Sequence, residues 1–293
     1  MLLEIFNVIA PIFVLAGIGF VWSKLGKPFP VEAVSLLVTQ IGTPCLVLSA
    51  LLKSEVDRVM LGQLALLSVL ALLSFAAVGW VALRLMKLPV RDFLPALTFP
   101  NNGNAGLSLC LFAFGPPGLA MGIVFFTICS VANFSFGQAI AAGRLSAREL
   151  LRIPVVYAVV VAALGKYFDL VPPAWAMRSL DTAGGIAIPL MLLMLGVSLA
   201  SLKVSDLAVA AKLTFLRLGL GMAVGLGLVW LFDLDGVARG TMLIQCAMPV
   251  AVINFVFATR HGRDAPAVAG LVVVSTLLSF ATLPLLMYLV LGE

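Results

Sequence analysis

Residues 99–106 read Phe99-Pro100-Asn101-Asn102-Gly103-Asn104-Ala105-Gly106, inside the longest charge-free run of the chain, which extends from Phe93 to Gly143. That run is apolar enough to sit in a lipid bilayer, where every backbone N–H and C=O group must be hydrogen-bonded. Proline and glycine weaken the helix that would supply those bonds. We therefore predict a membrane-spanning helix with an unwound segment from Pro100 to Asn104, whose freed helix ends line a polar site.

The composition is that of a membrane protein. Of the 293 residues, 62% are hydrophobic and 11% are charged, whereas soluble domains carry about 25% charge. Because a spanning helix needs roughly 20 mainly apolar residues, we predict an all-α polytopic membrane protein. The stretch from Met1 to Trp22 lacks a basic n-region and an Ala-x-Ala site, so we expect it to be the first span. The four cysteines form no C-x-x-C pair and are expected to be buried apolar residues, so neither a metal nor any other cofactor is expected.

Ten spans are expected, joined by short loops: 2–22, 29–52, 60–83, 93–114, 118–142, 153–170, 180–202, 206–232, 237–259 and 267–291. One set of alternate loops carries 12 of the basic residues and the other set carries 5. The positive-inside rule places the richer set in the cytoplasm, so both termini are expected outside. The richer set is Lys24, Lys27, Arg84, Lys87, Arg91, Arg144, Arg148, Arg152, Lys203, Lys212, Arg260 and Arg263. These positions explain the net charge of +5 without a nucleic-acid partner.

The breaks recur along the chain. Pro44, in Ile41-Gly42-Thr43-Pro44, is followed 145 residues later by Pro189, in Ile186-Ala187-Ile188-Pro189. Pro100 is followed by Pro249 after 149 residues. Chance agreement among the 16 prolines is the alternative to a repeat. We predict two five-span halves, residues 1–142 and 153–293, joined by a cytoplasmic loop at 143–152. Because five is odd, the second half enters the membrane from the opposite side, as in an inverted-topology repeat.

The candidate site combines the two broken helices. The second half of each begins near the midplane with unpaired N–H groups that can hold an anion, and the first half ends with free carbonyls that suit a cation. Side-chain amides add donors and acceptors without a fixed charge. Alternatively, these amides only cap the broken helices or bond neighbouring spans, as we expect for Gln245. The candidate substrate-binding residues are Asn101, Asn102, Asn104, Pro100, Gly103, Pro249, Val250, Asn254, Thr43, Pro44 and Arg217.

Some members of that set have a second interpretation. Thr43 and Pro44 can form a wall of the site or a packing kink. Arg217 is the only basic residue deep in a span. It can attract the anion, snorkel to the interface, or bond an opened helix. Ser108 is expected to bond its own helix.

Absent residues exclude several functions. No Asp or Glu lies near the middle of an expected span, which argues against a carboxylate proton relay. No base accompanies a candidate serine, so we expect no enzyme, and no GxxxxGK[ST] motif is present for ATP coupling. His261 is expected in a cytoplasmic loop.

The segments 100–107 and 111–115 resemble the fourth-span signature of bacterial members of the auxin efflux carrier family. Residues 248–254, 275–279 and 283–285 resemble that family's ninth and tenth spans, so the resemblance covers essentially the whole chain. Bile acid:sodium symporters are similar in fold, more distantly.

The resemblance implies ten spans as two inverted five-helix repeats, with helices 4 and 9 crossing at their breaks. Spans 1, 2, 6 and 7 would form a scaffold that often dimerises, and spans 3–5 and 8–10 would form an elevator-type transport domain. The family carries organic anions such as auxin, malate and malonate, and its carboxylate-contacting asparagine maps onto the Asn101–Asn104 cluster. The expected location is the bacterial cytoplasmic (inner) membrane. The long cytoplasmic loop of the plant carriers is absent.

Three functions remain open. The first is a secondary active or facilitative transporter of small organic anions in the lipid bilayer. The second is a sodium-coupled organic-anion symporter of the bile acid type, which the free half-helix carbonyls would serve. The third is a membrane sensor that binds a ligand without moving it.

Overall fold

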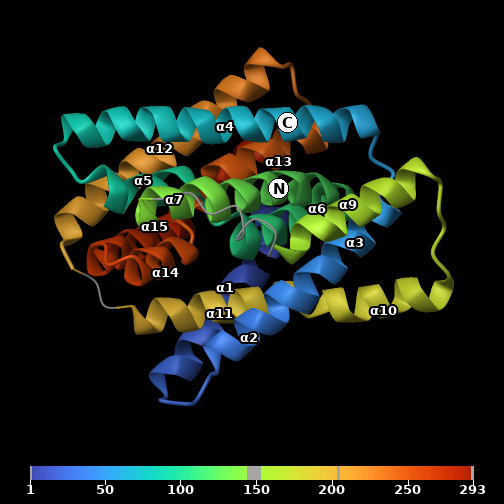
Figure 1. Ribbon diagram of the computed structural model, residues 1–293, viewed down its shortest axis with the longest axis horizontal. Helices are drawn as coiled ribbons and strands as arrows, with labels where there is room; N and C mark the ends of the chain where they lie inside the picture. The colour runs from blue at the N-terminus through green and yellow to red at the C-terminus, as the bar shows by residue number, and fades with distance from the viewer. Residues whose placement is uncertain (1, 144–152, 203–204, 292–293) are drawn as a thin grey trace.

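The computed structural model describes residues 2–143, 153–202 and 205–291 (Figure 1). The first part contains α1 (Leu2–Lys24), α2 (Val31–Leu37), the π-helix η1 (Val38–Gly42), α3 (Thr43–Lys53), α4 (Arg58–Leu85), α5 (Val90–Thr98), the π-helix η2 (Asn102–Gly106), α6 (Leu107–Ala132), the π-helix η3 (Asn133–Gly137) and α7 (Gln138–Ala142). The second part contains α9 (Pro154–Tyr167), α10 (Ala174–Gly185), α11 (Ala187–Ser201), α12 (Leu207–Leu231), α13 (Gly236–Ala247), α14 (Ile253–Arg260) and α15 (Ala265–Leu291).

The described residues are helical apart from connecting segments and one isolated β-bridge. Seven helical segments among them are long and apolar enough to cross a membrane. The all-α class predicted from the sequence is therefore confirmed, and the seven apolar segments agree with a multi-pass membrane protein. The expected connecting loop at 143–152 lies outside the described residues except for Gly143, and so do Arg144, Arg148, Arg152 and Lys203.

The difference between seven and ten spans has a local cause. The expected sixth span is only the 14-residue α9, and the expected ninth is divided into α13 and α14. The expected fourth and fifth spans share the continuous segment Asn102–Ala142, which is 41 residues long. Gly115 interrupts this segment with φ 63° and ψ −150°, a conformation that glycine adopts readily, and two prolines follow it.

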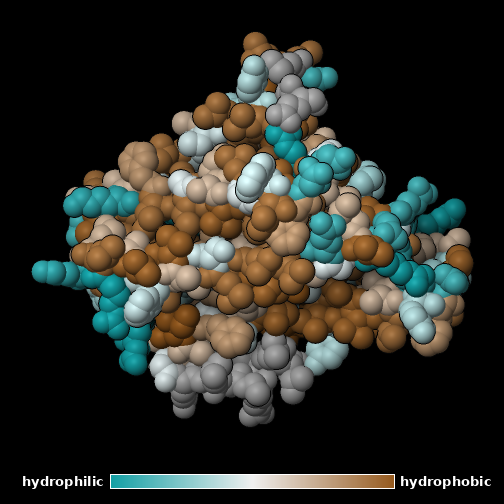
Figure 2. Space-filling view, turned by 90° about the horizontal axis from the view of Figure 1, so that it is seen from above, coloured by the Kyte–Doolittle hydropathy of each residue, from teal (hydrophilic) through white to brown (hydrophobic). Residues whose placement is uncertain are grey.

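The helices pack in two recognisable sets. α1 lies along α11, and α3 contacts α9 and α10. α4 packs on α5, α6 and α12, and α12 also packs on α13 and α15. Figure 1 shows α4 along one side of the molecule and α10 and α11 along the opposite side. The space-filling view shows hydrophobic surface over the middle of the molecule and much of the hydrophilic surface toward the two ends of its long axis (Figure 2).

The breaks at Pro44 and Pro189 are close in space. The π-helix η1 ends at Gly42, and the helical segment before Pro189 is interrupted at Ile186. A Cβ placed on Gly42 would lie 3.4 Å from the Cβ of Ala187, so the two interruptions are in contact. Thr43 is buried at this crossing, with 4% of its surface exposed.

The packing of α1 on α11 depends on two glycines. A Cβ on Gly19 would lie 2.1 Å from the carbonyl oxygen of Leu193, and one on Gly196 would lie 1.8 Å from the carbonyl oxygen of Ala16. Both clashes involve backbone, which cannot rotate away as a side chain can. The two helices therefore approach as closely as small-residue interfaces in membranes allow.

We predict that Gly19→Ala and Gly196→Ala each lower the free energy of unfolding by about 1–3 kcal/mol, the usual effect of overpacking. The measurement is the midpoint of thermal unfolding in detergent. Gly17→Ala is the matched control, because nothing lies within 4 Å of a Cβ at that position on the same helix. Equal midpoints for Gly19→Ala and Gly17→Ala would contradict the prediction.

Candidate functional site

The two proline breaks meet in the interior of the molecule. The chain is extended at Phe99 after α5, and again at Met248 after α13. Pro100 and Val250 form an antiparallel β-bridge. The N–H of Asn101 donates to the carbonyl of Pro249 at 2.7 Å, and the N–H of Ala251 donates to the carbonyl of Phe99 at 3.4 Å. Each broken segment thus supplies backbone hydrogen bonds that the other has lost.

Pro249 leaves a carbonyl of α13 that needs a hydrogen-bond donor from another helix. Because proline has no N–H, the carbonyl of Gln245, four residues earlier, has no donor within its helix. Asn102 Nδ2 donates to that carbonyl at 2.9 Å and to Gln245 Oε1 at 2.5 Å. Gln245 Nε2 in turn donates to the carbonyl of Gly122 at 3.4 Å. A Cβ on Gly106 would lie 2.5 Å from Gln245 Oε1, so a glycine is needed to admit this side chain.

The next carbonyl of α13, that of Cys246, is hydrogen-bonded by the side chain of Arg217. The N–H of Val250 donates to Ser275 Oγ on α15 at 3.1 Å, so it does not serve the carbonyl of Cys246. Arg217 Nη2, from α12, donates to that carbonyl at 2.9 Å. The end of α13 is therefore capped by side chains from two other helices.

Asn254 supports the crossing from the second break. Its Nδ2 donates to the carbonyl of Phe99 at 3.0 Å, and only 3% of its surface is exposed. Pro100, Pro249 and Val250 are buried around this contact. These residues hold the two extended segments together.

The unwound segment is shorter than the sequence predicts. Asn102 to Gly106 form the π-helix η2 instead of extending the break to Asn104. The carbonyl of Asn101 accepts from the N–H groups of Ala105 at 3.4 Å and Gly106 at 3.1 Å. A wide first turn can form here because Gly103 and Gly106 have no side chains to obstruct it, so the second half-helix begins at Asn102.

Several amide atoms at the crossing have no partner among the described residues. Asn101 Nδ2, Asn102 Oδ1 and Asn254 Oδ1 are all buried without a hydrogen bond. Because an unmade hydrogen bond by a buried polar group costs about 1–3 kcal/mol, these atoms are available to a ligand or to water.

Asn104 differs from its neighbours. Asn101 and Asn102 are 4% and 1% exposed, whereas Gly103 and Asn104 are half-buried. The carbonyl of Asn104 accepts from Ser108 Oγ at 2.8 Å, as expected for a hydroxyl that bonds its own helix. The N–H groups of Gly103 and Asn104 lie in the first turn of the second half-helix, where no intrahelical acceptor is available. Asn104 is therefore partly exposed and has an N–H without an intrahelical acceptor.

The remaining predicted site residues make packing or structural contacts. Thr43 begins α3 directly after Gly42, which lies against Ala187, and this supports the packing interpretation of Thr43 and Pro44. Their neighbour α11 also packs against η2. Arg217 is fully buried and bonds the opened helix α13, which is the structural interpretation of this residue.

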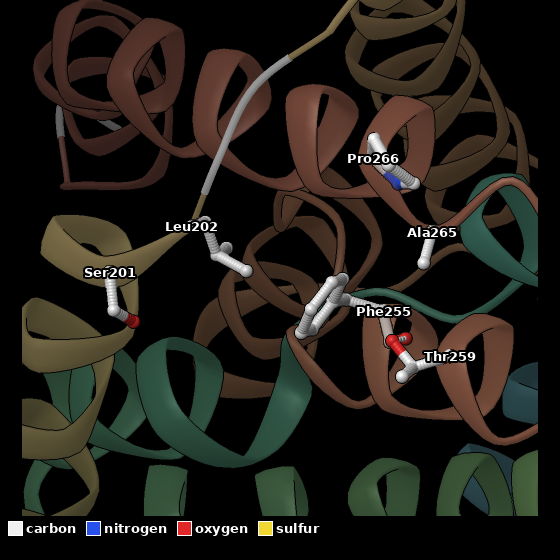
Figure 3. Close-up of a pocket in the computed structure, with 6 residues that line it drawn as sticks. All are labelled: Ser201, Leu202, Phe255, Thr259, Ala265 and Pro266. Carbon is white, nitrogen blue, oxygen red and sulfur yellow. Dashed lines mark hydrogen bonds between the residues drawn. The ribbon is translucent and has the colours of Figure 1, made fainter.

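Two cavities lie against opposite ends of α15. One, of about 480 Å³, is lined by residues from α11, α14 and the start of α15: Ser201, Leu202, Phe255, Thr259, Ala265 and Pro266. Figure 3 shows the ring of Phe255 between Leu202 and Ala265. The other, of about 360 Å³, is lined by Glu4, Asn7, Val8, Phe112, Ala113 and Leu291. Phe255, which lines the first cavity, directly follows Asn254 of the crossing in sequence.

Sequence reasoning treated Gln245 as a structural amide but did not identify its partner, and it gave Ser275 no role. The need for an outside donor at Gln245 could be found from the backbone chemistry of proline, whereas the role of Ser275 could not. A proline in a buried helix frees the carbonyl four residues earlier, and that residue here is Gln245.

Comparisons with known proteins agree with this architecture. A family model described as membrane transport protein matches residues 138–287, and this is the auxin efflux carrier family. A protein from Methanothermobacter thermautotrophicus named "Uncharacterized transporter" is 24% identical over 287 residues, covering 94% of each chain. A protein from Rhizobium meliloti named "Putative malonate transporter" is 24% identical over 312 residues, covering 98% of this chain and 96% of its own.

The family match extends over about half of the chain, and the two relatives align over nearly all of it. Family and relatives are transporters, not enzymes, and the structure has several membrane-length apolar helices. The chain is therefore a multi-pass membrane transporter that belongs to the auxin efflux carrier family of membrane transport proteins.

Proposed function

We propose that the protein carries small organic anions across the membrane, by secondary active or facilitative transport, and that it holds the substrate carboxylate where the two broken helices cross. The main support for this proposal is the group of unpaired amide atoms at the crossing. Among them, Asn101 Nδ2 is a buried hydrogen-bond donor without a partner. No Asp or Glu is buried in the described part of the chain, so no fixed negative charge opposes an anion there.

The start of the second half-helix provides the binding groups. The N–H groups of Gly103 and Asn104 carry the partial positive charge of a helix N-terminus. The side-chain amides of Asn104 and Asn101 add donors on the same turn. The unpaired oxygens of Asn102 and Asn254 can accept from a hydroxyl or a water that accompanies the substrate. The groups that contact the anion are thus neutral, and they bind it through hydrogen bonds.

The architecture that we propose has ten spans in two inverted five-helix repeats. The segments α5 with η2, and α13 with α14, supply the fourth and ninth spans in pieces, and α9 supplies the sixth. Recurrence of the breaks after 145 and 149 residues supports the repeat. Because ten is an even number of spans, both termini lie on the same side, which is outside when the basic loops lie in the cytoplasm.

We propose an elevator-type movement between two packed sets of helices. The contacts of α1 with α11 and of α3 with α9 and α10 support a scaffold, which can also form a homodimer. The contacts among α4–α6 and α12–α15 support a separate transport domain. The cavities at the two ends of α15 both lie between these sets, and they support alternating access to the crossing.

The substrate class that we propose is small carboxylates, such as malonate, malate or auxin-like acids. The name of the Rhizobium meliloti relative supports malonate as the first probe. The proposed location is the bacterial cytoplasmic membrane.

Asn104→Ala is expected to lower labelled malonate exchange in proteoliposomes while leaving the unfolding temperature unchanged. Losing one hydrogen bond to a charged group costs about 1.5–3 kcal/mol, which corresponds to roughly a tenfold to hundredfold loss of affinity.

Ser179→Ala is the matched control, since that hydroxyl bonds only its own helix, at the carbonyl of Trp175. Unchanged exchange by Asn104→Ala would reject the assignment of Asn104. Malonate binding by the folded protein without any flux would reject transport of malonate and favour the sensor function.

Asn102→Ala is expected to affect stability as well as exchange. The substitution leaves the carbonyl of Gln245 without its donor, at a cost of about 1–3 kcal/mol. The midpoint of thermal unfolding should therefore fall, in contrast to Asn104→Ala. An unchanged midpoint would show that the bond to Gln245 does not stabilise the crossing.

A sodium-coupled symporter is the second candidate, and the end of α5 favours it. Pro100 has no N–H for the carbonyl of Ala96, and the N–H of Asn101 donates to Pro249, so it does not serve Leu97. Carbonyls freed in this way can coordinate sodium.

Replacing sodium by choline separates the two candidates. The proposed carrier should exchange malonate at an unchanged rate, because its site needs no bound cation. A loss of exchange that sodium restores would establish the symporter instead.

A further inference from the structure

Arg217 is a charged side chain in the interior of the helix bundle. It lies on α12, about 15 Å along the helix from Leu207 at 1.5 Å per residue, and its side chain is fully buried. Its Nη2 donates to the carbonyl of Cys246 at 2.9 Å, and its guanidinium carbon lies 4.4 Å from the centre of the Phe75 ring. Hydrogen bonding and cation–π attraction therefore fix its position.

The C-terminal end of α13, which Arg217 contacts, attracts a positive charge. α13 ends at Ala247, and the last carbonyls of a helix carry its partial negative charge. The carbonyl of Cys246 is available because the N–H of Val250 donates to Ser275 instead. In many transporters such half-helix ends coordinate a bound cation. Here a tethered guanidinium occupies that place.

The charge of Arg217 is not neutralised nearby. It is the only charged side chain that is buried among the described residues. Its Nε and Nη1 have no hydrogen-bond partner there. Arginine remains protonated at neutral pH. The crossing therefore carries an unbalanced positive charge on a side chain that has no exposed surface.

The repeat itself does not require this charge. The position 149 residues before Arg217, the same separation as between Pro100 and Pro249, is Ser68. Ser68 is buried and donates to the carbonyl of Leu64 on its own helix at 2.6 Å. The first half of the chain thus has a neutral residue, Ser68, at the position where the second half has the charged Arg217.

We propose that Arg217 is a built-in counter-charge that moves with the substrate. The inference rests on the proposed function, because it requires α12 to travel with the anion. Arg217 compensates one negative charge of the substrate, so a loaded carrier moves less charge through the membrane than the free anion would. A monoanion then crosses in an electrically neutral unit, and the empty carrier returns with a positive charge.

This arrangement changes which step the membrane potential drives. The work done by the potential scales with the charge that moves. Substrate exchange uses only the loaded carrier, whereas net transport also needs the empty carrier to return. With Arg217 in place, exchange of a monoanion is independent of the potential, and net transport depends on it through the return step.

The test measures exchange of labelled malonate in proteoliposomes at several imposed potassium diffusion potentials. The variants are Arg217→Gln, which removes the charge, and Arg217→Lys, which keeps it. At neutral pH, where malonate is a dianion, Arg217→Gln should show a steeper dependence of exchange on potential than the unaltered protein. Arg217→Lys should retain the original slope. The same slope in all three proteins would overturn the inference, and a structural role alone would not alter the slope.

A second measurement needs no variant, in case Arg217→Gln does not fold. In the unaltered protein, exchange should lose its dependence on potential as the pH is lowered until malonate becomes a monoanion. A dependence that persists at that pH would overturn the inference. Failure of the proposed function is a separate result, because folded, unaltered protein would then exchange no malonate at any potential.

Discussion

The missing N–H of proline is the constraint on which the rest of this structure depends. A bilayer offers no water to a freed carbonyl, so the break at Pro249 must find donors elsewhere in the protein. They come from Asn102 on the first broken helix and from Arg217 on α12. The breaks at Pro100 and Pro249 then share backbone hydrogen bonds across an isolated β-bridge. Each break would leave unpaired backbone groups if it stood alone. Together, the two breaks form one hydrogen-bonded crossing.

The crossing uses neutral amides for hydrogen bonding and a single cation for charge. Amides can satisfy backbone groups on one side and leave atoms available on the other, as Asn102 does with its bonded Nδ2 and unpaired Oδ1. A carboxylate in the same place would repel an anionic substrate. The electrostatic character of the site is therefore set by helix ends and by Arg217, and its shape is set by glycines that let Gln245 approach.

Sequence reasoning located the interruptions but not their partners. Apolar length and charge content were sufficient for the membrane class, and the prolines at 100 and 249 marked where the helices stop. Three asparagines within four positions could not be distinguished, because a π-helical turn changes which of them faces α13. Arg217 was equally ambiguous, because α12 is apolar around most of its surface and gives no preferred face. The role of Ser275 depended on packing between α15 and the break, which local sequence does not encode.

The mutual satisfaction of the two breaks also bears on how the chain enters the membrane. Synthesis proceeds from the N-terminus, so the segment around Pro100 reaches the bilayer long before α13 and α14 exist. Until then the carbonyl of Phe99 has neither Ala251 nor Asn254 to bond it, and Asn102 has no Gln245. Those groups must therefore find other partners, such as water, until the later helices have been made. The later helices thus complete the crossing, because they supply the hydrogen-bond partners that the first broken helix lacks.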